Sequence, residues 1–258
     1  MKLLRKIYKQ IFSEKLRIQI ILLIRKTHSF RLRGKKVTCN CCNKSFKQFL
    51  PYGDSKIKRE NACCPWCSSL ERTRMLWDFL GKSNLLKNNN KILHFAPETI
   101  IEKNLLKNKD IYYLTADINP LLAMDIIDIT KIKFFDDSFD VIICSHVISV
   151  VKDDIKALSE LFRVLKNGGI LILMEHLYND LEITVEDHSI NTDEERTKLY
   201  GQPYLERLYG NDFSKRISAV GFQVEKYNHA STLSSEAFTK YALQNSGFIF
   251  LCKKNSKT

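Results

Sequence analysis

The chain has 258 residues, of which 44% are hydrophobic and 27% charged, with a formal net charge of +12 at pH 7. This length suits one large domain with a smaller appendage, and the composition can supply a sizeable core. The best candidate for a membrane span, 18–24, is well short of the roughly 18 apolar residues required, and no small-residue cleavage site of a secretory signal follows it. We therefore expect a cytoplasmic chain with neither a membrane-spanning helix nor a secretory signal.

The positive charge is concentrated in residues 1–36, which hold twelve of the 41 Lys and Arg residues and one of the 29 Asp and Glu residues. The rest of the chain is close to neutral, which argues against a whole-protein nucleic-acid binder. Apolar residues recur at helical spacing over 1–28, so we predict a basic amphipathic helical arm over 1–36. Such an arm can contact nucleic acid or the membrane surface peripherally, or it can pack on the main domain with a solvated basic face. We favour packing, because basic amphipathic helices are common.

Six of the eight cysteines lie between Cys39 and Cys67, which indicates metal binding in a reducing compartment and not a disulfide scaffold. Two CxxC pairs 21 residues apart supply four thiolates, a full tetrahedral shell for a structural Zn²⁺. The x2 spacing selects Cys39, Cys42, Cys64 and Cys67 as metal ligands. The adjacent Cys41 and Cys63 complicate this assignment.

Beyond the cysteines the pattern alternates between strands and helices, which predicts a doubly wound parallel sheet with right-handed crossovers. An antiparallel pair closes the series, and residues 177–216 are irregular and polar, as expected of a segment that covers a site. Strands are predicted over 92–95, 111–116, 139–145, 170–175, 222–227 and 248–253, and helices over 69–88, 99–107 and 153–165, with Gly81 ending the first. We expect a zinc ribbon and connecting helix over 37–88 and an α/β domain over 89–258.

Residues 138–175 read as an acidic turn, a buried strand, a polar strand end, an amphipathic helix, a Gly-Gly stop and a second buried strand. Phe139-Asp140 stands directly before the first of these strands, and we interpret Asp140 as structural. This order resembles the second half of a class I S-adenosylmethionine-dependent methyltransferase. The resemblance implies a Rossmann-like methyltransferase sheet that binds the cofactor across the carboxyl ends of its strands.

The first strand leads into His94-Phe95-Ala96-Pro97-Glu98, a loop without glycine. Methyltransferases usually carry an acidic residue at the position of His94 and glycine at that of Ala96. A pyrophosphate cofactor needs a glycine-rich turn for close backbone approach, so NAD and FAD are disfavoured. S-Adenosylmethionine has no phosphate and tolerates this loop.

Acidic residues at the next strand ends are candidates for the cofactor's ribose and adenine. Asp117, followed by Ile118, ends the second strand and can accept both ribose hydroxyls; a helix N-cap or loop aspartate is the alternative. Asp128 with Ile129 fits an aspartate that meets the adenine amino group, and Asp125 competes for this role. Ser145-His146 ends the strand predicted over 139–145, where we expect the methyl donor and the methyl acceptor to meet.

His146 can orient the acceptor or take its proton, and it is our catalytic candidate; a histidine that only lines the cofactor is the alternative. The predicted cofactor residues are His94, Phe95, Ala96, Pro97, Asp117, Ile118, Asp128, Ile129, Ser145 and His146.

Three segments together resemble a bacterial family of class I methyltransferases with an N-terminal zinc ribbon: 61–72 (NACCPWCSSLER), 93–98 (LHFAPE) and 144–147 (CSHV). Further similarity lies at 194–196, 200–202 and 209–213. The resemblance covers about residues 30–253 and implies S-adenosylmethionine-dependent methylation with a structural zinc.

Two segments differ from the family pattern. After the His-Val pair, here His146-Val147, the family has Leu-Glu-His, whereas this chain has Ile148-Ser149-Val150. After the Gly-Gln pair, the family has Asp-His-Val-Arg, whereas this chain has 203–207 (PYLER). We expect a small-molecule or glycan-type acceptor. A nucleic-acid-directed methyltransferase and a non-catalytic S-adenosylmethionine-binding module are the alternatives, the second suggested by these differences.

Overall fold

The computed structural model describes residues 14–53, 58–244 and 246–255. The chain forms two compact units. The ribbon unit consists of Met1–Asp78 and Leu233–Ser246, and the sheet unit of Phe79–Thr232 and Gly247–Thr258. The first part of the predicted arm, 1–13, lies outside the described residues. The domain boundaries expected from the sequence, 37–88 and 89–258, stay predictions.

The sheet unit is built on seven strands in the order β12-β13-β9-β8-β5-β6-β7. Six of these seven strands run in the same direction, whereas β13 is antiparallel to both of its neighbours, which confirms the predicted closing antiparallel pair. The two-residue strand β7 was not expected. The strands are β5 (Asn90–Phe95), β6 (Ile111–Asp117), β7 (Asp125–Ile126), β8 (Phe139–Ser145), β9 (Leu165–Met174), β12 (Gln223–Tyr227) and β13 (Ile249–Lys253).

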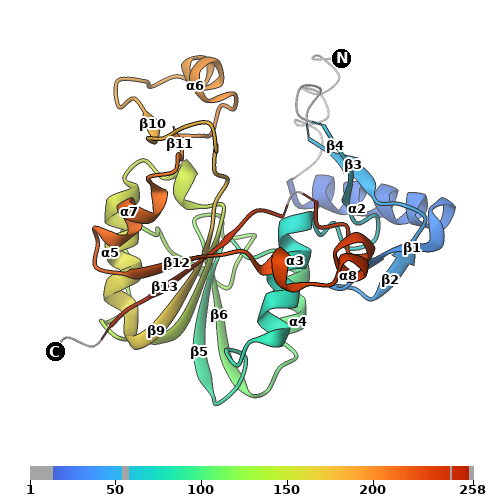
Figure 1. Ribbon diagram of the computed structural model, residues 1–258, viewed down its shortest axis with the longest axis horizontal. Coiled ribbons are helices and arrows are strands. Elements are labelled where there is room, and N and C mark those ends of the chain that lie inside the picture. Colours follow the sequence, from blue (N-terminus) through green and yellow to red (C-terminus); the bar gives the residue numbers. More distant parts are fainter. Residues whose placement is uncertain (1–13, 54–57, 245, 256–258) are drawn as a thin grey trace. The chain divides into compact units, whose positions relative to one another are not determined.

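Helices cover both faces of this sheet, with α4 (Thr99–Leu105) on one and α5 (Asp154–Val164) and α7 (Phe213–Ser218) on the other (Figure 1). Helix α5 begins after Asp153, whose side chain accepts a hydrogen bond from Lys156 N at 2.9 Å. It buries one apolar stripe on the sheet because its apolar residues recur every three to four positions: Ala157, Leu158, Leu161 and Val164.

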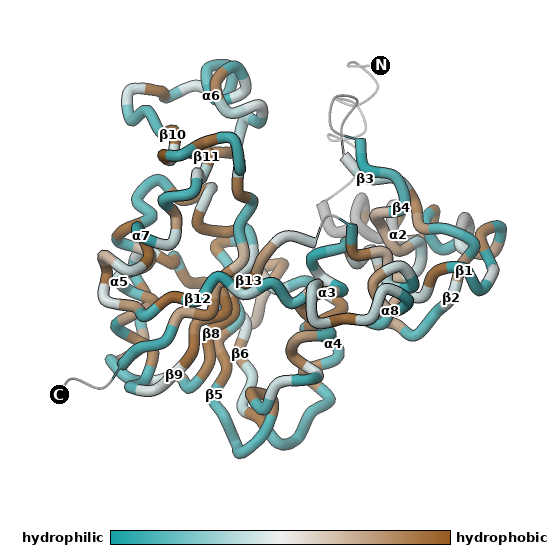
Figure 2. Tube along the Cα trace, in the orientation of Figure 1, coloured by the Kyte–Doolittle hydropathy of each residue, from teal (hydrophilic) through white to brown (hydrophobic). Residues whose placement is uncertain are grey.

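The central strands are apolar almost throughout, as parallel strands covered on both faces must be (Figure 2). In β8 the exception is Asp140, whose carboxylate accepts a hydrogen bond from Lys91 N at 2.8 Å and pairs with Lys166 Nζ at 2.8 Å. These contacts tie the starts of β5, β8 and β9 together, in agreement with the structural role predicted for Asp140.

The Gly168-Gly169 pair lies within β9 as an irregular turn, and not before a strand that starts at Ile170 as predicted. Gly168 has a φ of +76°, a region that residues with a Cβ rarely adopt. A Cβ on Gly169 would lie 2.8 Å from the carbonyl oxygen of Lys166. Both glycines are therefore required by the backbone itself.

Between β9 and α7 the chain makes an excursion over residues 175–212, which projects beyond one end of the sheet (Figure 1). The excursion contains β10 (Val185–Glu186), α6 (Asp193–Tyr200) and β11 (Arg207–Leu208), and the two strands pair antiparallel. Helix α6 starts at a capping box, in which Thr192 and Glu195 bond to each other's backbone amides.

The ribbon unit consists of two short hairpins and two flanking helices. The chain returns from the sheet unit to add α8, a contribution that the sequence did not indicate. Its elements are α2 (Glu14–Arg31), β1 (Arg33–Cys39), β2 (Lys44–Phe46), β3 (Leu50–Tyr52), β4 (Arg59–Cys63), the start of α3 (Glu71–Lys82) and α8 (Ser235–Lys240). Helix α3 runs past Gly81 to Lys82, so the prediction that Gly81 ends this helix is wrong.

Helix α2 is the helical part of the predicted arm among the described residues, and it contacts the ribbon, whereas 33–36, predicted as part of the helical arm, begin β1. Arg25 donates a hydrogen bond to Ser68 Oγ at 2.9 Å, and the ammonium group of Lys26 lies 5.5 Å from the Trp66 ring centre. Leu23 and Phe30 on the same helix are exposed. None of the described helices combines the length and the apolar character that crossing a membrane requires.

Candidate functional site

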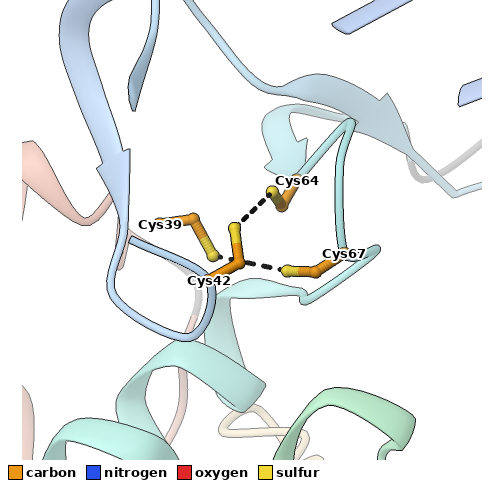
Figure 3. A group of neighbouring side chains, drawn as sticks. All are labelled: Cys39, Cys42, Cys64 and Cys67. Carbon is orange, nitrogen blue, oxygen red and sulfur yellow. Dashed lines mark hydrogen bonds between the residues drawn. The ribbon is translucent and has the colours of Figure 1, made fainter. Parts of the chain in front are cut away.

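The four cysteines selected by their spacing converge in the ribbon unit (Figure 3). Their four Sγ atoms lie within 4.8 Å of one another, with Cys39 and Cys67 3.5 Å apart and Cys42 and Cys64 3.8 Å apart. Tetrahedral Zn²⁺ with bonds of about 2.3 Å to sulfur would hold the sulfurs about 3.8 Å apart. The four residues therefore fit a structural zinc ion.

Backbone geometry explains why these four meet. Cys39 ends β1 and Cys42 lies in the turn before β2, whereas Cys64 and Cys67 lie in the turn that follows β4. Each CxxC pair thus occupies a tight turn next to a hairpin, and the two turns face each other (Figure 3). Four thiolates close the coordination shell, so the site is structural and not catalytic.

The other two cysteines of the ribbon are thiols and not part of this cluster. Cys41 donates weak hydrogen bonds to Asn40 Oδ1 and to the carbonyl oxygen of Thr73. Cys63 donates weak hydrogen bonds to the carbonyl oxygens of Cys64 and Ser68. Burial raises the pKa of both thiols, which favours the protonated form. This resolves the ambiguity that their adjacency to the predicted ligands creates.

A buried arginine lies beside the cysteine cluster. Arg74 donates to the carbonyl oxygens of Ala62, Ser69, Tyr241 and Ala242 at 2.7–2.9 Å, and so fastens the segment after α8 to the ribbon. The hydroxyl of Ser69 in turn lies 3.1 Å from Cys39 Sγ and 3.3 Å from Cys67 Sγ. With a divalent ion bound by four thiolates, the buried guanidinium would offset part of their negative charge and the hydroxyl would donate a hydrogen bond to sulfur.

In the sheet unit a cavity of about 530 Å³ opens at the carboxyl ends of β5, β6 and β8. Its wall includes seven of the ten predicted cofactor residues: Phe95, Ala96, Asp117, Ile118, Asp128, Ile129 and His146. The remaining lining residues are Ala116, Ile127, Thr130, Val147, Val150, Val151, Lys152, Asp153 and Lys156. The cavity is thus mostly apolar with a few carboxylates and amines, which suits a nucleoside.

The two carboxylates proposed for ribose and adenine both line this cavity. Asp117 accepts a hydrogen bond from Asn119 N through Oδ1 at 2.7 Å, so it also orders the loop after β6. Asp128 accepts from the amide and the hydroxyl of Thr130, both at 2.8 Å, and these bonds lower the pKa of the carboxyl. Both bonds of Asp128 go to Oδ1.

The competing candidate for the adenine contact, Asp125, does not line the cavity. Its carboxylate pairs with Lys133 Nζ at 2.6 Å. The geometry therefore favours Asp128.

Three predicted cofactor residues are not among those that line the cavity: His94, Pro97 and Ser145. His94 is fully buried, with Nδ1 2.8 Å from the Tyr113 hydroxyl and Nε2 3.2 Å from Glu98 Oε2 at an angle unsuited to a hydrogen bond. Ser145 is buried, and its Oγ makes no hydrogen bond within the described part of the chain. The role of these residues in cofactor binding stays a prediction.

Two residues of the cavity wall adopt a left-handed backbone conformation although they carry side chains. Ala96 has a φ of +46° and His146 a φ of +56°. The His146 amide donates to the carbonyl oxygen of Met174 at 2.7 Å, which holds the turn after β8. The strain at Ala96 explains why methyltransferases usually carry glycine here.

We expect Ala96→Gly to stabilise the protein by about 1 kcal/mol, because glycine adopts a positive φ without the steric cost of a Cβ. Denaturant unfolding of the two proteins at one pH would measure the difference. Ala116→Gly is the matched control: Ala116 lies in regular β6 on the same wall, where glycine should destabilise. Equal changes in the free energy of unfolding for Ala96→Gly and Ala116→Gly would contradict backbone strain at Ala96.

Sequence reasoning missed the wall that follows β8. Val147, Val150, Val151, Lys152 and Asp153 lie between β8 and α5 and line the cavity. Cofactors of parallel sheets lie beyond the carboxyl ends of strands and next to helix starts. The connection from the predicted strand 139–145 to the predicted helix 153–165 was therefore the available signal.

Comparison with known proteins identifies the chemistry. Residues 102–173 match a family model described as a methyltransferase domain. This stretch runs from α4 to the end of β9 and includes most of the cavity wall. The chain therefore carries an S-adenosylmethionine-dependent methyltransferase domain on a Rossmann-like sheet. No curated protein sequence matches the chain.

The methyltransferase fold is shared with solved structures at low sequence identity. The cyclase SpnF has a TM-score of 0.52 and 13% identity over 72% of this chain and 83% of its own. A Haloferax volcanii methyltransferase solved with the Trm112 activator has a TM-score of 0.49 and 11% identity over 70% of this chain and 89% of its own. YcgJ of Bacillus subtilis has a TM-score of 0.47 and 16% identity over 69% of this chain and 93% of its own. Of these three, the match to SpnF supports the fold, and at 13% identity it supports the fold alone.

Proposed function

We propose that the cavity binds S-adenosylmethionine and that the methyltransferase acts on a small-molecule or glycan-type acceptor. The observation that carries the cofactor site is the convergence of Asp117 and Asp128 on an apolar cavity at the strand ends. The cofactor supplies a methyl group on a positively charged sulfur. The chain's own residues hold, orient and desolvate the reactants.

The proposed roles follow the positions of the side chains on the wall. Asp117 accepts hydrogen bonds from both ribose hydroxyls, and Asp128 accepts one from the adenine amino group through Oδ2. Phe95, Ile118 and Ile129 provide apolar surface beside them. His146 orients the acceptor nucleophile or takes its proton as the methyl group is transferred.

A small acceptor agrees with the charge distribution. The basic excess belongs to residues 1–36, and the remainder of the chain, which includes the cavity, is nearly neutral. A nucleic-acid acceptor would favour a basic surface beside the site. We keep peripheral membrane contact as a proposal for the arm, because Leu23 and Phe30 of α2 are exposed among basic residues. A cytoplasmic location is a further proposal, since the ribbon's thiols require reducing conditions.

A non-catalytic binding module is the second candidate, and it rests on the changed residues after His146. Ser149, at a position where the family has Glu, donates to Glu175 Oε2 at 2.8 Å. Val150, at a position where the family has His, lines the cavity. The chain therefore uses both positions to shape the wall, and it lacks the family's imidazole there.

Calorimetric titration of the purified protein with S-adenosylhomocysteine tests the cofactor site. We expect saturable one-to-one binding. No binding at millimolar ligand would contradict the proposed site. Incubation with methyl-labelled S-adenosylmethionine and panels of sugars, small phenols, amines and RNA then separates the acceptors. Labelling of RNA alone would overturn the small-molecule proposal, and cofactor binding without transfer to any panel would favour the binding module.

A further inference from the structure

The connection 147–153 between β8 and α5 forms one side of the cavity wall. It contains a single 3₁₀ turn, Ile148–Val150, and no strand. Backbone hydrogen bonds satisfy some of its groups: Val150 N and Val151 N donate to the carbonyl oxygens of Val147 and Ile148, and Glu206 N donates to that of Ser149. Groups of the connection without such bonds need side-chain partners. We call this connection the wall loop.

A glutamate directly after β9 holds two amides of the wall loop. Glu175 is 4% exposed, and its Oε1 accepts hydrogen bonds from Ile148 N at 2.7 Å and Ser149 N at 3.3 Å. Its Oε2 accepts from the Ser149 hydroxyl at 2.8 Å. The N-terminal half of the loop is thus fixed to the central sheet.

An arginine from the excursion holds the carbonyl groups of the same loop. Arg207, on β11, donates through Nη1 to the carbonyl oxygens of Ile148 at 3.1 Å and Val151 at 2.6 Å. Its Nη2 donates to the carbonyl oxygen of Lys152 at 2.8 Å. The side chain is 1% exposed. One buried guanidinium therefore satisfies three of the loop's carbonyl groups at once.

The remaining contacts of Arg207 lead away from the cavity. Its Nε donates to Glu186 Oε2, on β10, at 3.0 Å and lies 3.7 Å from Asp154 Oδ2 at the start of α5. Arg216 on α7 pairs with the same two carboxylates, at 2.6–2.9 Å. The hydrogen bonds described for Arg216 reach only carboxylates, whereas Arg207 also holds the wall loop.

We propose that Arg207 is a positioning residue that couples the excursion to the cofactor cavity by holding the wall loop in its binding shape. The proposal rests on the proposed function in one respect, namely that the cavity binds S-adenosylmethionine. Because coupling between two sites is reciprocal, cofactor binding should also order the excursion.

Arg207→Lys and Arg216→Lys make a matched pair for testing this. Both keep the buried positive charge near Asp154 and Glu186, so both are expected to fold. A lysine at 207 has a single nitrogen and cannot reach three carbonyl oxygens as the guanidinium fork does. We expect Arg207→Lys to weaken S-adenosylhomocysteine binding about tenfold or more, and Arg216→Lys less than about threefold.

Hydrogen–deuterium exchange of the full chain supplies a readout that does not depend on the cofactor. In the free protein, amides of 147–153 should exchange about tenfold faster in Arg207→Lys than in Arg216→Lys. Adding S-adenosylhomocysteine should slow exchange over 184–208 in the native protein and fail to do so in Arg207→Lys.

Two results would overturn the proposal: equal loss of affinity in both variants, or faster loop exchange in Arg207→Lys with unchanged affinity. The first would show a general effect of the ion network, and the second would show that the loop's order does not govern binding. If the native protein bound no S-adenosylhomocysteine, the proposed function would be wrong. In that case the exchange of 147–153 still tests Arg207, because equal exchange in the two variants would show that Arg207 does not hold the wall loop.

Discussion

Cys42→Ser is expected to release the zinc ion and unfold the ribbon unit. The hydroxyl of serine is a poor zinc ligand, and a structural zinc site contributes on the order of 10 kcal/mol to the folding of small zinc modules. The two hairpins of the ribbon, with strands of three to seven residues, have little core of their own to replace that contribution. Metal analysis of the purified protein should give one zinc per chain in the native protein and none in the variant.

Cys41→Ser is the matched control, because Cys41 is the immediate neighbour of Cys42 but donates to carbonyl oxygens instead of joining the cluster. This variant should keep its zinc and its thermal unfolding midpoint within a few degrees of the native protein. Retention of zinc by Cys42→Ser together with its loss from Cys41→Ser would show that the ligand set is wrong. Alkylation of all eight thiols in the native state would show that the cysteines bind no metal.

Asp117→Ala should weaken S-adenosylhomocysteine binding about 100-fold. A carboxylate that accepts two ribose hydroxyls makes two charge-assisted hydrogen bonds, each worth about 1.5–3 kcal/mol, and the truncated side chain would leave both hydroxyls without that partner. Titration calorimetry measures the change directly. Part of any loss could arise from the loop after β6, since Asp117 also accepts from Asn119 N.

Asp117→Asn separates these contributions, because its amide oxygen can still accept from Asn119 N while the charge is removed. Asp125→Ala controls for a lost carboxylate on the adjacent strand away from the cavity, and its affinity should change less than about threefold. If Asp125→Ala weakened binding more than Asp117→Ala, the proposed placement of the ribose would be wrong.

Much of the sheet unit could be predicted because its signals are local. The strand 139–145 is apolar over 141–144, and the structure gives β8 the bounds predicted for it. The spacing of the two CxxC pairs likewise selected the four cysteines whose sulfur atoms converge in the ribbon unit, since each pair occupies a single turn. The family-model match confirms the reaction class that the same region suggested.

The features that the sequence did not indicate depend on contacts between segments distant in the chain. His94, whose role in cofactor binding stays a prediction, is buried with its Nδ1 against the hydroxyl of Tyr113, 19 residues later. Segment 233–246 joins the ribbon unit through Arg74, more than 160 residues earlier. No periodicity in the sequence reports such pairings.

The sequence by itself indicated the fold class and the four cysteines that converge, because hydrophobic periodicity and cysteine spacing act over a few residues, and its resemblance to methyltransferases indicated the reaction class. Only the tertiary structure decided which residues form the cavity wall, since the wall is assembled from the ends of three strands. It alone showed that Arg207 of the excursion holds the loop that lines the cavity, because this contact spans 55 residues or more of chain. Buried polar groups must find partners wherever the fold brings them, and the sequence does not list those partners.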